Sequence, residues 1–138
     1  MKRVMIVDDS LIVRVNLKKV FESQGYQVVA EAANGQDAVE KYEKLKPDLV
    51  TMDITMPVLD GISALQRIRE MDEEACVVMI SALGQEIKII EAMNCGARHY
   101  IVKPFKDEDV ISKIDSIFDC AMCQVCQVEE QADVVVSR

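Results

Sequence analysis

The sequence has no cluster of basic residues and no long hydrophobic run. Its 24 acidic and 16 basic residues give a formal net charge of −8, a balance that disfavours direct binding to nucleic acid or to an anionic membrane. The apolar run after Met1–Arg3 is too short for the core of a signal peptide, and no run approaches transmembrane length. We therefore expect a cytoplasmic protein.

The cysteines do not form the even-numbered framework of a small secreted domain. There are five, and reduced thiols are the expected state. Three of them crowd the carboxyl-terminal region at the spacing of a partial iron–sulfur motif: Cys120, Cys123 and Cys126. Glu130 stands where a fourth ligand is expected, and three thiolates do not close a tetrahedral zinc site. Packing or an exposed oxidisable patch is the simpler interpretation of these thiols.

Hydrophobic periodicity predicts a single α/β domain. Short apolar runs alternate five times with segments of helical period, over a length of 138 residues that suits one domain with its own core. This alternation is typical of βαβ units around a parallel sheet. Strands are predicted at residues 4–7, 28–31, 49–52, 77–80 and 100–102. Helices are predicted near residues 10–23, 36–45, 61–71, 85–94 and 107–122.

The apolar content of the strands indicates their places in the sheet. The first, third and fourth strands are apolar almost throughout, as strands covered by helices on both faces are. The second and fifth are expected at the edges. After about residue 120 the sequence no longer follows this scheme. We therefore predict a domain at residues 1–119 and a carboxyl-terminal extension at residues 120–138.

Polar residues stand at the carboxyl ends of four of the predicted strands. Asp8 and Asp9 follow the first strand, Asp53 the third, Ser81 the fourth and Lys103 the fifth. In an open parallel sheet these strand ends face one crevice. Carboxylates, a hydroxyl and a lysine that converge there can hold a divalent cation and a phosphoryl group together.

Each of these residues also has a simpler interpretation. Asp8 and Asp9 could be solvated loop residues beside Ser10, which is placed to cap the next helix. Asp53 could be a lone loop aspartate, a metal ligand, a general base or a nucleophile that accepts a phosphoryl group. Ser81 could cap a helix or a turn, and Lys103 could be a solvated surface lysine. Only their joint occurrence at the strand ends is specific.

With their neighbours, these residues resemble the receiver domain of bacterial two-component response regulators over residues 2–119. The resemblance is carried by six motifs: Met5–Ser10, Asn34-Gly35, Asp53–Pro57 with Asp60-Gly61, Ile80–Ala82, Gly84-Gln85 and Val102–Phe105. Within the family, the chain is most similar to single-domain chemotaxis regulators. The resemblance implies a flavodoxin-like (βα)5 open parallel sheet with strand order 2-1-3-4-5 and helices on both faces.

The resemblance assigns roles to the carboxylates. It implies that Asp53 is the phosphoacceptor. It also implies a Mg²⁺ cofactor bound by Asp9, by Asp53 and by the backbone carbonyl of Thr55, with Asp8 acting through a water molecule.

The resemblance also assigns a phosphoryl contact and a switch. Ser81 and Lys103 would contact the phosphoryl oxygens, and Tyr100 would be the aromatic switch that turns inward when Ser81 is drawn to the phosphate. Serine at position 81 keeps the hydroxyl of the more usual threonine but loses its β-branching, so coupling of its rotamer to Tyr100 should be looser.

The partners are implied in the same way. The resemblance implies a sensor histidine kinase as phosphoryl donor, an output protein such as a component of the flagellar-motor switch, and a phosphatase. It implies a signalling switch that catalyses its own phosphotransfer and autodephosphorylation rather than an enzyme with a separate substrate. We expect a monomer, with a dimer formed through the carboxyl-terminal extension as the alternative.

Other functions compete with this hypothesis. A single-domain phosphorelay intermediate or an orphan regulator would use the same residues. A phosphatase of the haloacid dehalogenase type also uses a strand-end aspartate with Mg²⁺, but its motif generally has a second aspartate where Thr55 stands. A flavodoxin-like electron carrier needs a glycine- and hydroxyl-rich loop after the first strand, and Asp8 and Asp9 would repel the flavin phosphate there.

Overall fold

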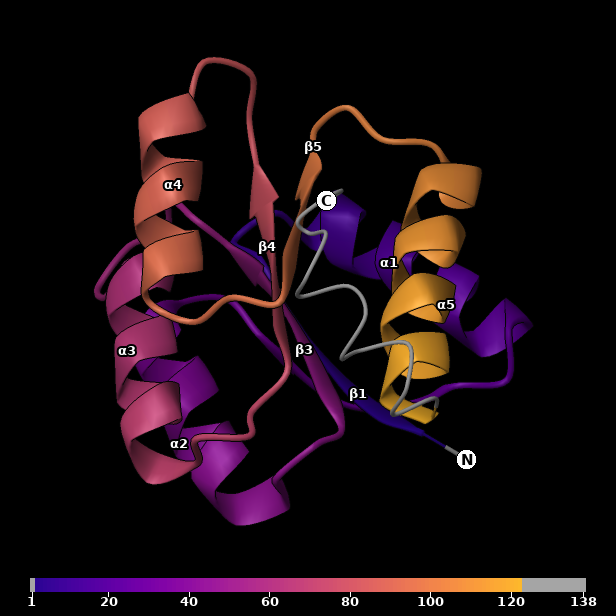
Figure 1. Cartoon of the computed structure of the whole chain (residues 1–138), viewed down its shortest axis with the longest axis horizontal. Helices are drawn as coiled ribbons and strands as arrows, with labels where there is room; N and C mark the ends of the chain where they lie inside the picture. Colours follow the sequence, from indigo (N-terminus) through magenta and orange to yellow (C-terminus); the bar gives the residue numbers. More distant parts are fainter. Residues whose placement is uncertain (1, 123–138) are drawn as a thin grey trace.

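The computed structural model describes residues 2–122, and describes side chains for residues 2–118. Five strands and five helices alternate along this part of the chain (Figure 1). The strands are β1 (Arg3–Val7), β2 (Gln27–Ala32), β3 (Leu49–Asp53), β4 (Val77–Ser81) and β5 (His99–Val102). The helices are α1 (Leu11–Ser23), α2 (Gly35–Leu45), α3 (Gly61–Met71), α4 (Glu86–Asn94) and α5 (Asp107–Met122). Every bound lies within one residue of its prediction.

The strands form one parallel sheet in the order β2-β1-β3-β4-β5. This confirms the predicted (βα)5 fold, with β2 and β5 at the edges. The three central strands are almost completely buried, which explains their apolar sequences. The direction of winding reverses between β1 and β3, so the chain leaves these two strands toward opposite faces and a crevice opens beyond their carboxyl ends.

Helices cover both faces of the sheet (Figure 1). Helices α2, α3 and α4 lie on one face, and α1 and α5 lie on the other. Successive residues of β1 enter the two cores alternately: Met5 and Val7 pack on the first face, and Val4 and Ile6 on the second. The sheet is therefore fixed from both sides, and its carboxyl-terminal edge is a firm base for side chains that follow the strands.

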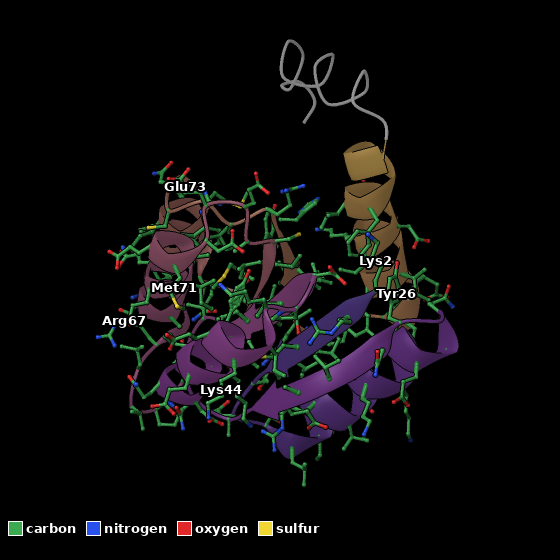
Figure 2. The ribbon with its side chains drawn as sticks, turned by 90° about the horizontal axis from the view of Figure 1, so that it is seen from below. Lys2, Tyr26, Lys44, Arg67, Met71 and Glu73 are labelled. Carbon is green, nitrogen blue, oxygen red and sulfur yellow. The ribbon has the colours of Figure 1, made fainter. Side chains whose placement is uncertain are left out.

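Aromatic contacts join α5 to the amino-terminal end of the sheet, opposite the strand carboxyl ends. Figure 2 shows Lys2 and Tyr26, which precede β1 and β2, beside α5. The Lys2 Nζ atom lies 5.1 Å from the ring centroid of Phe118 in α5. The Tyr26 ring centroid lies 5.7 Å from that of Phe118. These contacts fasten α5 to the sheet on the side away from the strand carboxyl ends.

The predicted boundary at residue 119 falls inside α5, which continues to Met122. Most of the predicted extension, including Cys123 and Cys126, lies outside the described residues, as does the side chain of Cys120. The division into a domain and an extension therefore stays a prediction. Among the residues searched, no helix combines the length and apolar character needed to cross a membrane.

Gly61 allows α3 to begin directly against the end of β3. Its N–H donates to the carbonyl oxygen of Ile54 over 2.7 Å, and an added Cβ would overlap the carbonyl oxygen of Asp53. We expect Gly61→Ala to lower the free energy of unfolding by about 3 kcal/mol, because the methyl group would push two packed backbones apart. Urea unfolding measures this loss.

Gly25→Ala is the matched control for that substitution. A Cβ at Gly25 would meet open space, although the residue has φ +87°. The cost of the left-handed conformation alone is about 1 kcal/mol. A loss for Gly61→Ala no larger than that for Gly25→Ala would contradict the explanation by the close approach of α3 to β3.

Candidate functional site

Three carboxylates gather where β1 and β3 end. Asp8 and Asp9 follow β1, and Asp53 is the last residue of β3. One carboxylate oxygen from each residue lies within 4.8 Å of the other two. Asp8 and Asp53 are 0% and 7% exposed, whereas Asp9 is exposed. Carboxylates this close repel one another unless a cation neutralises them.

Asp8 is held through both of its carboxylate oxygens. Its Oδ1 atom accepts a hydrogen bond from the backbone N–H of Ser10 over 2.9 Å, and its Oδ2 atom lies 3.0 Å from Lys103 Nζ. The Arg14 Nη1 atom donates to the backbone oxygen of Asp8 over 2.6 Å. Asp9, by contrast, forms no ion pair or side-chain hydrogen bond with any described residue. Of these two carboxylates, that of Asp9 is therefore the one free to take a ligand directly.

Lys103 brings a positive charge to the carboxylates from the end of β5. Its backbone N–H donates to the Ser81 oxygen over 2.7 Å, and its peptide bond to Pro104 is cis. Besides its contact with Asp8, its Nζ atom lies 3.6 Å from Asp53 Oδ1. The Lys103 side chain therefore points toward the carboxylates. One lysine faces three carboxylates, so the cluster keeps an excess of negative charge.

Burial and charge shift the protonation equilibria of the two central groups. Burial raises the pKa of Asp53 to about 6, and the Asp8 charge adds to the rise, while Lys103 opposes it. For Lys103, burial favours a lower pKa, but the hydrogen bond to Asp8 and the charges of Asp53 and Asp8 outweigh burial and raise the pKa. The lysine therefore stays cationic at neutral pH, and the carboxylate of Asp53 is costly to ionise without a second cation.

Ser81 places a buried hydroxyl at the end of β4, the strand next to β3. It is the last residue of β4 and is 0% exposed, and its Oγ atom has no hydrogen-bond partner among the described residues. In the ladder between β3 and β4, Asp53 pairs with Ile80, the residue before Ser81. A buried hydroxyl without a partner lowers stability, so its persistence at a strand end marks a position where a ligand oxygen can bind.

The remaining two predicted site residues flank this cluster. Thr55 is exposed two residues after Asp53, and its Oγ1 atom accepts a hydrogen bond from Gln85. Tyr100 is half-buried in β5 and packs against the core under α2, α3 and α4. The Nζ atom of Lys113 lies 4.6 Å from the Tyr100 ring centroid and donates to the Tyr100 backbone oxygen over 2.7 Å. The structure thus brings Asp8, Asp9, Asp53 and Lys103 into one cluster, with Ser81, Thr55 and Tyr100 on elements beside it.

Gln85 and Arg14 are site-lining residues that the sequence did not single out for a role. The Oε1 atom of Gln85 accepts from the backbone N–H of Ala82 over 2.6 Å, and its Nε2 atom donates to Thr55 Oγ1 over 2.9 Å. One unusual feature marks Gln85: it occupies the N-cap of α4, where short polar side chains are preferred. Its own side chain makes no cap hydrogen bond there. No comparable signal points to Arg14.

Comparison with known proteins decides the family. Residues 4–115 match the family described as the response regulator receiver domain. This chain is a member of the response regulator receiver family. The chemotaxis protein CheY of Thermotoga maritima is 47% identical over 116 residues, which cover 84% of this chain and 97% of that protein. CheY of Bacillus subtilis is 49% identical over 113 residues, which cover 82% and 94% of the two chains.

A solved receiver structure agrees with these relatives. The CheX-CheY-BeF3-Mg²⁺ complex from Borrelia burgdorferi matches with a TM-score of 0.82 and 42% sequence identity, over 85% of this chain and 89% of that one. The chain is therefore the receiver domain of a CheY-like response regulator, as its motifs predicted. CheY-like response regulators are signalling switches.

The residues of this receiver suit the Mg²⁺ that receivers typically use at an acidic pocket. The donors are carboxylate oxygens, which hard divalent cations prefer. The cluster keeps more negative charge than Lys103 offsets. The Ser81 hydroxyl at the end of the adjacent strand lacks a partner among the described residues. Each of these observations fits a site that is completed by a cation and an anionic group.

We expect Asp9→Asn to weaken Mg²⁺ binding by this receiver more than Asp8→Asn does. Asp9 is exposed and uncommitted, whereas both oxygens of Asp8 already have partners, Ser10 and Lys103. Calorimetric titration with MgCl₂ should show a loss of roughly 100-fold for Asp9→Asn and about tenfold for Asp8→Asn, the smaller loss being typical of an indirect ligand. Asp115→Asn on α5 is the control, and equal losses at positions 8 and 9 would contradict the ranking.

Proposed function

We propose that this receiver is a phosphorylation-activated switch in chemotaxis signalling, with Asp53 as the phosphoacceptor. The observation that carries the proposal is the convergence of Asp53 with Asp8, Asp9 and Lys103 at the ends of β1, β3 and β5. The chemotaxis assignment is supported by the two relatives named CheY, which are 47% and 49% identical. A single-domain phosphorelay intermediate or an orphan regulator is the alternative within the family.

Phosphotransfer would occur between a sensor histidine kinase of the CheA type and Asp53. A carboxylate oxygen of Asp53 attacks the phosphorus atom of a phosphohistidine in line with the bond to nitrogen. The new P–O bond forms as the P–N bond breaks, and the electron pair of the P–N bond leaves with the imidazole ring. Lys103, 3.6 Å from Asp53 Oδ1, neutralises part of the charge that the phosphoryl group brings.

Asp9, Asp53 and the backbone carbonyl of Thr55 would hold the Mg²⁺ ion, with Asp8 bound through water. The ion would supply positive charge that offsets the carboxylates and polarises the phosphoryl group. Burial of Asp8 and its contacts with Ser10 and Lys103 support its indirect role.

The output would be a change in the surface formed by α4, β5 and α5. The unpartnered hydroxyl of Ser81 would donate to a phosphoryl oxygen, and the ring of Tyr100, half-buried on the next strand, would turn inward. Helix α4 already exposes Ile87 and Ile90, which are 81% and 61% exposed. A change in the conformation of this surface would shift its affinity for an output protein such as a component of the flagellar-motor switch.

A partner that removes the phosphoryl group completes the proposed cycle. The relative from Borrelia burgdorferi was solved in a complex with CheX, and we propose a phosphatase partner of this kind for the present chain. The receiver would act as a cytoplasmic monomer, with a dimer through the carboxyl-terminal extension as the alternative. Chemotaxis and flagellar genes beside its own gene would favour chemotaxis over another phosphorelay.

Acetyl phosphate tests the proposed function without a kinase. We expect intact mass to show one phosphoryl group per chain when the protein is incubated with acetyl phosphate and Mg²⁺, and none when EDTA replaces Mg²⁺. Absence of the adduct with Mg²⁺ present would overturn the proposal. Sustained hydrolysis of p-nitrophenyl phosphate would favour a phosphatase instead.

A further inference from the structure

Gln85 joins the two loops that flank the phosphoacceptor. Its Oε1 atom accepts from the backbone N–H of Ala82 over 2.6 Å, and its Nε2 atom donates to the Oγ1 atom of Thr55 over 2.9 Å. The orientation of the amide is determined by chemistry, because the Ala82 N–H can only donate and must face the side-chain oxygen. One side chain thus connects the loop after β3 with the loop after β4.

The N–H of Ala82 points to the side of β4 on which Asp53 lies. In a parallel sheet the N–H and C=O of one residue face the same neighbouring strand, and successive residues alternate. The backbone oxygens of Cys76 and Ile80 accept from the β3 side, whereas those of Val77 and Ser81 accept from residues flanking β5. Ala82 follows Ser81 and therefore belongs to the β3-facing series.

This N–H has no acceptor in the ladder. The acceptor that continued pairing would offer is the backbone oxygen of Ile54, but that oxygen accepts from the N–H of Gly61 over 2.7 Å as the chain turns into α3. The side-chain oxygen of Gln85 accepts from the Ala82 N–H instead. The N–H of Ala82 is therefore a backbone donor at the end of β4, beside the buried Ser81 hydroxyl, and it is occupied by a side chain that can move.

We infer that Gln85 is a positioning residue that occupies the Ala82 donor until a phosphoryl group on Asp53 displaces it. The inference rests on the proposed function of Asp53. A free backbone N–H at a strand end binds anions, so a phosphoryl oxygen brought to this edge competes with Gln85 Oε1 for the same hydrogen. Displacement also breaks the tie to Thr55. Gln85 is the N-cap residue of α4. Displacement of its side chain would therefore change the hydrogen bonds at the start of that helix.

Phosphorylation rates test this competition. Gln85→Met keeps the length and flexibility of the side chain but removes its hydrogen bonds, and Gln85→Ala removes the side chain. With acetyl phosphate and Mg²⁺, both variants should be phosphorylated about two- to tenfold faster than the parent protein, which is the range that one net hydrogen bond covers. Thr55→Val should give a smaller increase, because the contact between Gln85 and Ala82 remains. Gln66→Ala on α3 is the control and should match the parent.

A purely structural role for Gln85 predicts the opposite sign. If Gln85 only holds the two loops together, both Gln85 variants should be phosphorylated at the parent rate or more slowly. That result would overturn the inference. A phosphoryl adduct on the parent protein would still support the proposed function. Absence of an adduct on the parent protein would instead overturn the proposed function itself.

A second measurement uses the parent protein and does not depend on the folding of a variant. In ¹⁵N-labelled protein with Mg²⁺, addition of beryllium fluoride should shift the Ala82 backbone amide and the Gln85 side-chain amide together, and the Gln66 side-chain amide should stay in place. A Gln85 side-chain resonance that does not move while Ala82 moves would contradict displacement.

Discussion

Asp53→Asn is expected to abolish phosphorylation by acetyl phosphate completely. The amide nitrogen and oxygen of asparagine are too weakly nucleophilic to attack phosphorus, while the side chain keeps the size of the carboxyl group. Asp53 is the last residue of β3 and lies within reach of both Lys103 and the other two carboxylates. Intact mass after incubation with Mg²⁺ and acetyl phosphate should therefore show no adduct.

Asp115→Asn on α5 is the matched control for this loss and should be phosphorylated like the parent protein. A phosphoryl group that persists in Asp53→Asn would contradict the assignment. Peptide mapping of that adduct would then identify the true acceptor, for which Asp8 and Asp9 are the nearest alternatives.

The same substitution should stabilise the metal-free fold. Burial, with the Asp8 charge, raises the pKa of Asp53 to about 6, above the value in an unfolded chain. A raised pKa means that the folded state loses stability as the pH rises from about 4 to 6, and that the penalty persists above pH 6. In EDTA at pH 7 the free energy of unfolding of Asp53→Asn should therefore exceed that of the parent by about 3 kcal/mol, and the difference should disappear below pH 4.

The sequence predicts the fold well because the hydrophobic pattern of the strands and the capping residues of the helices indicate the same elements. The apolar central strands can only be buried on both faces, and polar caps start the helices: Ser10 accepts from the N–H of Val13 at the start of α1, and Asp60 from that of Ser63 at the start of α3. Local chemistry and long-range packing therefore place the same boundaries, to within one residue.

The site is predicted less completely. That Asp53 and Lys103 approach each other follows from the shared direction of parallel strands, although they lie fifty residues apart in sequence. The unequal burial of Asp8 and Asp9 does not follow, because it depends on how the loop after β1 turns toward Ser10. The link from Gln85 to Thr55 depends on two irregular loops, whose conformations have no periodic signal in the sequence.

Lys103→Ala should strongly destabilise the metal-free protein. Among the described residues, Lys103 is the cation within ion-pair distance of the buried carboxylates of Asp8 and Asp53. Its removal leaves two close negative charges without compensation, which costs about 3 kcal/mol in the free energy of unfolding. Urea unfolding in EDTA measures the loss, and Lys106→Ala, at an exposed position, should change stability by less than about 0.5 kcal/mol.

A double-mutant cycle isolates the electrostatic cause of this loss. If repulsion between carboxylates is responsible, the double variant Asp53→Asn/Lys103→Ala should be more stable than Lys103→Ala, because the amide removes one of the two uncompensated charges. The coupling between positions 53 and 103 should be about 1–2 kcal/mol. Mg²⁺ should restore part of the stability of Lys103→Ala, since a cation held by Asp9 and Asp53 would replace the missing charge. Additive single effects, or a loss that Mg²⁺ leaves unchanged, would mean that Lys103 stabilises the fold through packing of its alkyl chain rather than through its charge.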